Sequence, residues 1–132
     1  MTAYHVPGDL IAFANRLADA SGAIAMRYFR RGAAVETKAD DSPVTIADKE
    51  AERAIRDLIG EYFPSHGIIG EEHERLEAKS EFVWVIDPID GTKSFITGRP
   101  LFGTLIALTR GGWPVLGVID QPALGERWVG AA

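Results

Sequence analysis

Hydrophobic residues recur at intervals of three and four in two stretches of the N-terminal half, and this spacing predicts two amphipathic helices. The first covers residues 9–31, with Asp9 as a candidate N-cap and Gly32 as a stop signal. The second covers residues 45–63 and ends before a proline, which cannot continue a helix. Residues 33–44 between them have no periodic apolar pattern and read as a loop.

After Pro64 the pattern changes to short apolar runs separated by glycines, which is typical of β-strands. Glycines at 111 and 112 join two of these runs in the manner of a hairpin. The pattern therefore predicts an α+β fold, with two helices packed on one face of a largely antiparallel sheet. The candidate strands are residues 67–70, 82–86, 101–109, 115–119 and 126–129.

Composition narrows the class of protein. The chain has 132 residues, 46% hydrophobic and 25% charged, the profile of a single globular domain. It contains no cysteine, which excludes disulfides, zinc–thiolate sites and thiol nucleophiles. Because we see neither a bilayer-spanning apolar stretch nor the pattern of a secretory signal, we expect a cytoplasmic protein without a membrane partner.

The charge is acidic and unevenly distributed. A net charge of −5 argues against nucleic acid as a partner. Between Glu36 and Asp90 the chain has 15 acidic and 6 basic residues, whereas the remainder has 4 acidic and 8 basic residues. This excess of carboxylates fits either a solvated helix face with a loop or a cluster that binds cations, and charge alone does not choose between them.

The segment WVIDPIDGTKSF (84–95) carries the strongest chemical signal. Asp87 and Asp90 follow a predicted strand only three residues apart, where a cation would offset their repulsion. Ligands that are all oxygen favour Mg²⁺ or Mn²⁺ over zinc. Gly91 and Thr92 then present backbone N–H groups at a turn, which suits phosphate. The alternative interpretation is two ordinary turns, Asp-Pro and Asp-Gly.

Two further segments place carboxylates at the ends of predicted elements. Glu71 directly follows the 67–70 strand. Asp48 begins the second helix, where it has the spacing of a capping box with Thr45 and could also accept a hydrogen bond from a hydroxyl. Both interpretations of Asp48 stay open. Three further acids are expected to decorate a solvated loop, namely Glu72, Glu74 and Glu77.

Together, the segments SPVTIADKEAE (42–52), GIIGEE (67–72) and WVIDPIDGTKSFITG (84–98) resemble the inositol monophosphatase family of metal-dependent phosphatases. The resemblance extends from about Leu10 to the C-terminus. It implies a sugar-phosphatase-like layered fold and the Mg²⁺-dependent hydrolysis of a small phosphate monoester. Within the family, residues 100–130 look most like the histidinol-phosphate phosphatase branch, so histidinol phosphate is the expected substrate and inositol 1-phosphate the alternative.

The resemblance also assigns metal ligands. Glu71 and Asp87 resemble ligands of a first metal, together with the backbone carbonyl of Ile89. Asp87 and Asp90 resemble ligands of a second metal. Glu71 also resembles a ligand of a third, weaker and mostly hydrated Mg²⁺.

The remaining roles follow from the same resemblance. Thr92, oriented by Asp48, resembles the hydroxyl that helps position the attacking water, and the N–H groups of Gly91 and Thr92 would hold the phosphate. Lys38 falls in the loop that closes over the metals in this family, which implies an electrostatic or gating role. Beyond the metal motif, Asp120 is interpreted as a turn residue and Trp128 as a core aromatic.

The chain departs from the family in length. Family members continue into a second half that supplies one more Asp to the second metal and most of the substrate pocket. Asp120 and Glu126 are the only acids after Asp90, and neither lies in that motif. We therefore expect residues 1–132 to be an N-terminal half, completed by a homodimer partner or a missing C-terminal half. The other possibility is a non-catalytic remnant that binds Mg²⁺ or phosphate weakly.

Overall fold

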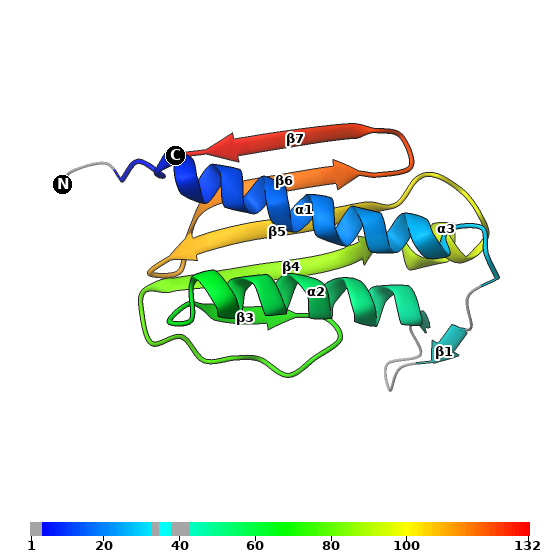
Figure 1. Ribbon diagram of the computed structural model, residues 1–132, viewed down its shortest axis with the longest axis horizontal. Helices are drawn as coiled ribbons and strands as arrows, with labels where there is room; N and C mark the ends of the chain where they lie inside the picture. The colour runs from blue at the N-terminus through cyan, green and yellow to red at the C-terminus, as the bar shows by residue number, and fades with distance from the viewer. Residues whose placement is uncertain (1–3, 33–34, 38–42) are drawn as a thin grey trace.

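The computed structural model describes residues 4–32, 35–37 and 43–132. Helices α1 (Gly8–Tyr28) and α2 (Ile46–Tyr62) lie side by side on one face of a five-stranded sheet (Figure 1). The strands follow one another across the sheet in chain order. They are β3 (Gly67–Gly70), β4 (Phe82–Asp90), β5 (Gly103–Arg110), β6 (Trp113–Gln121) and β7 (Glu126–Ala131).

The sheet is largely antiparallel, as the sequence predicts. The pairs β4–β5, β5–β6 and β6–β7 are antiparallel, whereas β3 pairs parallel to β4. A parallel pair needs a crossover connection, and the long segment between β3 and β4 supplies it. The two helices and this sheet confirm the α+β class.

The capping predictions are right for the second helix and wrong for the first. Thr45 and Asp48 form the predicted capping box, each side chain accepting from the other residue's backbone N–H group. The predicted cap of the first helix is wrong, because Pro7 is the N-cap and Asp9 lies inside the first turn. The helix also ends at Tyr28 rather than at residue 31, since the chain turns extended at Phe29.

Three short elements escaped the sequence pattern. Strands β1 (Val35–Thr37) and β2 (Pro43–Thr45) pair antiparallel within the stretch predicted as a loop. Helix α3 (Thr92–Ile96) follows Gly91, whose φ of +87° reverses the chain after β4. Strands β1 and β2 contain no run of apolar residues, and α3 is too short to display a helical period, which is why the pattern missed them.

Two apolar clusters hold the layers together. The larger one lies between the helices and the sheet, where Phe13 packs edge-on against Trp84. The smaller one lies beneath α3 and brings α1, α2 and the end of β4 together. Its buried members are Ala25, Phe29, Ala47, Ile89, Phe95 and Phe102. This smaller cluster fixes the segment that contains Asp90, Gly91 and Thr92.

In the part of the chain that the structure describes, no helix combines the length and the apolar character that crossing a membrane requires.

Candidate functional site

One of the predicted carboxylates directly follows β3, and another lies within the neighbouring strand β4. Gly70 of β3 pairs with Ile86 of β4 in parallel register, and Glu71 and Asp87 are the residues that follow this pair on the two chains. Both line a single cavity of about 790 Å³. The parallel pairing, which is the exception in this sheet, thus directs both residues to the same cavity.

The cavity lies along the sheet face opposite the helices. Side chains alternate between the two faces of a strand, and the helix-facing set, including Trp84 and Ile86, fills the core. The opposite set includes Val85 (39% exposed), Ile119 (50%) and Trp128 (53%), all of which line the cavity. The cavity is therefore an apolar trough with two carboxylates at its rim.

The structure does not gather the predicted ligands into one complete cluster. Strand β4 continues past Asp87 to Asp90, with a register irregularity between the two residues, so Asp87 does not end the strand as expected. Asp90 is exposed and is not among the residues that line the cavity. Among the described residues, no three His, Cys, Asp or Glu side chains converge in a manner that would hold a metal ion.

Asp48 performs both of the functions left open by the sequence. Its carboxylate is 2% exposed, and its Oδ2 accepts hydrogen bonds from Thr45 N (2.9 Å) and Thr45 Oγ1 (2.6 Å). Its Oδ1 lies 3.2 Å from Thr92 Oγ1, which is also 3.1 Å from the carbonyl oxygen of Ile89. The cap of α2 thus holds the hydroxyl at the start of α3.

Gly91 and Thr92, the predicted phosphate-binding residues, lie at the junction between β4 and α3. The left-handed backbone conformation of Gly91 favours glycine, and an added Cβ would lie 3.1 Å from the carbonyl oxygen of Leu101. Thr92 is the first residue of α3, so its N–H group lacks an acceptor within the helix. Lys38, the predicted loop residue, lies outside the described residues.

Two predictions about the later strands are wrong. Asp120 belongs to β6 rather than to a turn, and it is 5% exposed, where it pairs with Arg127 of β7. Trp128 is not a core aromatic; its side chain borders the trough opposite Ile119. The alternation along β7 would have placed Trp128 on the outer face, but the sequence alone did not show that this face is uncovered.

The sequence analysis did not single out Glu52, which is buried one turn after Asp48 on α2. Its carboxylate accepts hydrogen bonds from the backbone N–H groups of Glu72 and His73, directly after Glu71. The spacing of four residues from Asp48 was the available signal, since it places both side chains on one helix face.

The donor chemistry fits a hard divalent cation. Glu71 and Asp87 offer carboxylate oxygens from adjacent strands to one cavity, and Mg²⁺ commonly binds through one or two carboxylates while retaining several waters. The hydroxyl of Thr92, held by Asp48, adds a polar group suited to contact water. The described residues therefore fit part of a cation site rather than a closed cage.

Comparison with known proteins finds one family model and several related phosphatases. The model of the inositol monophosphatase family matches residues 7–132. The chain is 56% identical over 121 residues to the chloroplastic bifunctional phosphatase IMPL2 of Arabidopsis thaliana, covering 90% of this chain and 35% of that protein. It is 48% identical over 117 residues to the histidinol-phosphatase of Chlorobaculum parvum, covering 88% of this chain and 45% of the relative.

A solved structure extends the likeness to three dimensions. An inositol monophosphatase from Zymomonas mobilis superimposes with a TM-score of 0.77 at 47% identity, covering 99% of this chain and 49% of its own. The chain thus spans between a third and a half of the length of the proteins that it matches.

Proposed function

The chain belongs to the inositol monophosphatase family, and on that premise we propose that it forms the N-terminal half of a Mg²⁺-dependent phosphomonoesterase acting on a small phosphorylated metabolite. The observation that carries the proposal is the convergence of Glu71 and Asp87 on one cavity from adjacent parallel strands. We propose that a second copy of the chain or a C-terminal half completes the site. We also propose that the enzyme acts in the cytoplasm.

The ligand assignments are part of the proposal. Glu71 and Asp87, with the carbonyl oxygen of Ile89, would hold the first cation, and Asp87 with Asp90 would hold the second. When bound, Mg²⁺ supplies charge neutralisation to the phosphoryl oxygens and acidity to a water nucleophile. Mn²⁺ has the same preference for oxygen ligands and would substitute for it.

The chain's own residues would orient the reactants. While the Thr92 hydroxyl donates to Asp48, its oxygen lone pairs can accept a hydrogen bond from a water and fix the direction of that water. The N–H groups of Gly91 and Thr92 would donate to phosphate oxygens. Because positioned donors remove much of the entropic barrier, this arrangement supports attack of water on phosphorus without a covalent nucleophile on the protein.

Two observations bear on the substrate. Residues 100–130 resemble the histidinol-phosphate phosphatase branch, and the relative from Chlorobaculum parvum is named a histidinol-phosphatase. The Zymomonas mobilis protein, at nearly the same identity, is named an inositol monophosphatase. We propose histidinol phosphate as the substrate and keep inositol 1-phosphate as the second candidate.

A direct competition between the two substrates tests this choice. In a complete enzyme that carries this half, we expect histidinol phosphate to give the higher kcat/KM, measured by phosphate release in Mg²⁺. A higher kcat/KM for inositol 1-phosphate would move the chain to the inositol branch without changing the proposed chemistry. Release of phosphate from neither substrate would favour the remaining candidate, a remnant that binds Mg²⁺ or phosphate without turnover.

A further inference from the structure

The carboxylate of Glu52 is fully buried and fully engaged. Its Oε1 accepts a hydrogen bond from Glu72 N (2.9 Å), and its Oε2 accepts from His73 N (2.9 Å) and from Arg56 Nε (3.0 Å). A buried charge is costly unless it is paired and hydrogen-bonded, and here two amides and a guanidinium meet that need. One side chain of α2 therefore binds the backbone that follows β3.

Gly70 allows this close approach. A Cβ added at Gly70 would lie 2.5 Å from both Cδ and Oε1 of Glu52, far inside van der Waals contact. Because three donors hold the carboxylate, it could not move aside without losing hydrogen bonds. The end of β3 and the Glu52 side chain therefore fit together only with glycine at this position.

Other contacts fix the same segment against α2. Arg56 Nη2 donates to the carbonyl oxygen of His73 (3.2 Å), and His73 Nε2 lies 3.1 Å from the carbonyl oxygen of Lys49. The backbone is thus fixed at Gly70 by sheet pairing and at residues 72 and 73 by α2. Glu71 is the single residue between these two anchors.

The helix itself sets a distance between two parts of the site. Asp48 and Glu52 are one turn apart on the same face of α2, a rise of about 6 Å. Asp48 holds the hydroxyl of Thr92, and Glu52 holds the segment after Glu71. Both side chains are buried, so the surrounding residues restrict their positions.

We infer that Glu52 is a positioning residue, which fixes Glu71 relative to Asp87 and Thr92 through the backbone of residues 72 and 73. The inference rests on the proposed role of Glu71 as a metal ligand. A ligand set works only when its supporting contacts hold it within a fraction of an ångström, and a buried carboxylate that collects two loop amides provides such support.

Metal affinity and amide exchange in the 132-residue chain test the inference. In Glu52→Gln, the side-chain NH₂ cannot accept a hydrogen bond, so one of the two loop amides loses its partner. We expect calorimetry to show about tenfold weaker Mn²⁺ binding, and the amides of residues 72 and 73 to exchange faster with solvent. The matched control is Glu61→Gln, an exposed residue on the same helix, which should change neither quantity.

A conservative variant separates positioning from simple stability. Glu52→Asp keeps the charge but shortens the side chain, so its Mn²⁺ affinity should fall between those of Glu52→Gln and the unsubstituted chain. Unchanged affinity and unchanged exchange in Glu52→Gln would overturn the inference. If Glu52→Gln does not fold, the exchange rates of the unsubstituted chain decide, because unprotected amides at residues 72 and 73 would equally overturn it.

The two proposals fail in different ways. If the unsubstituted chain binds no Mn²⁺, or binds it no better than Glu71→Gln, the proposed metal chemistry is contradicted. Exchange at residues 72 and 73 in the Glu52 variants then still decides whether Glu52 fixes this segment.

Discussion

At the scale of single residues, His66 shows how the core constrains a titratable group. It is 7% exposed, stacks on Phe63, and its Nδ1 accepts a hydrogen bond from Trp84 Nε1 at 3.0 Å. Because an indole N–H can only donate, the neutral ring must carry its proton on Nε2. Burial lowers the pKa of His66 below its ordinary value, since a charged imidazolium would lose its hydration here.

This burial predicts a loss of stability in acid. Well above pH 6.5, which is about the ordinary pKa of histidine, His66 is neutral in both folded and unfolded chains and its protonation contributes nothing. As the pH falls below that value, the unfolded chain binds a proton that the folded chain resists, so the free energy of unfolding decreases, by at most about 1.4 kcal/mol per pH unit for one group. Urea unfolding at pH 7.5, 6.5 and 5.5 measures the slope.

The control for this prediction is His66→Gln, which keeps an acceptor for Trp84 but cannot titrate. Its free energy of unfolding should depend less on pH between 7.5 and 5.5. Equal slopes for the two proteins would show that His66 is not the group responsible.

The residues that the sequence analysis singled out and the one that it missed lie in different sequence surroundings. The sequence predicts site roles for Asp87 and Thr92, because they stand in a motif that resembles a known family. Glu52 stands among other charged residues of an amphipathic helix, and composition gives no sign that this carboxylate points inward. The four-residue spacing from Asp48 places it on the same helix face, but its burial is visible only in the packing.

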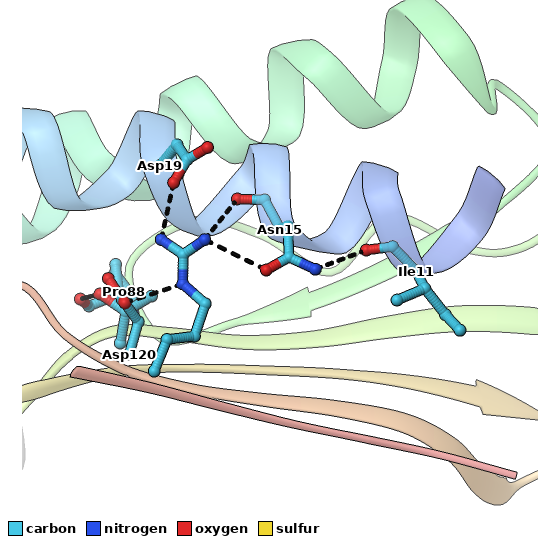
Figure 2. A network of polar contacts seen from close by, with 7 residues as sticks. Ile11, Asn15, Asp19, Pro88 and Asp120 are labelled. Atoms are coloured by element: carbon cyan, nitrogen blue, oxygen red, sulfur yellow. Dashed lines mark hydrogen bonds and ion pairs between the residues drawn. The ribbon is translucent and has the colours of Figure 1, made fainter. Parts of the chain in front are cut away.

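At the scale of elements, one arginine joins the hairpin of β6 and β7 to α1 (Figure 2). Arg127 Nε donates to Asp120 Oδ1 (2.9 Å) and its Nη2 donates to Asp19 Oδ1 (2.7 Å). Its Nη1 lies within 3.3 Å of both oxygens of Asn15, backbone and side chain. These contacts tie strands at the end of the chain to the first helix.

Removing this arginine should loosen the hairpin. Arg127→Leu leaves the buried carboxylate of Asp120 without its partner, so we expect the free energy of unfolding to fall by about 1–3 kcal/mol, discounted because Arg127 is partly exposed. Arg110→Leu removes an exposed pair with Glu81 and should cost less than about 1 kcal/mol. Chemical denaturation of both variants provides the comparison.

The double variant Arg127→Leu/Asp120→Leu separates the two contributions. It should regain part of the loss, because it removes the unpaired buried charge together with its partner. A double variant that is no more stable than Arg127→Leu alone would contradict this explanation.

The ends of helices and strands are predicted accurately where a local sequence signal marks them. The second helix was placed well because a capping box and a proline mark its two ends. The strand at 82–86 was placed four residues too short, because Asp-Pro-Ile-Asp reads as a turn. The pairing of its last part with β5 depends on residues distant in sequence, and a local pattern cannot show it.

At the scale of the whole molecule, the two faces of the sheet differ. The helices cover one face (Figure 1), while Val85, Ile119 and Trp128, on the other, remain exposed. Exposed apolar patches of this kind mark interaction surfaces. The sequence predicted the layer arrangement from periodicity but not which residues of the outer face would be left bare, because that depends on what else packs there.

The 132-residue chain alone should turn over substrate slowly or not at all. Glu71 and Asp87 are the carboxylates that the described residues bring to the trough, and two cations close together need more negative charge to offset their repulsion. Phosphate release from histidinol phosphate and inositol 1-phosphate measures the activity, with Asp90→Asn as the control for contaminating phosphatases. Turnover near one per second, abolished by that substitution, would contradict this expectation.

The central claim is that this half of the molecule binds a divalent cation through Glu71 and Asp87, and calorimetric titration with Mn²⁺ tests it most directly. The unsubstituted chain should bind Mn²⁺, and Asp87→Asn should weaken binding by at least about tenfold, more than either Glu71→Gln or Asp90→Asn, because Asp87 is assigned to both cations. Glu61→Gln should bind as the unsubstituted chain does. Equal affinity in the unsubstituted chain and in Asp87→Asn would contradict the account.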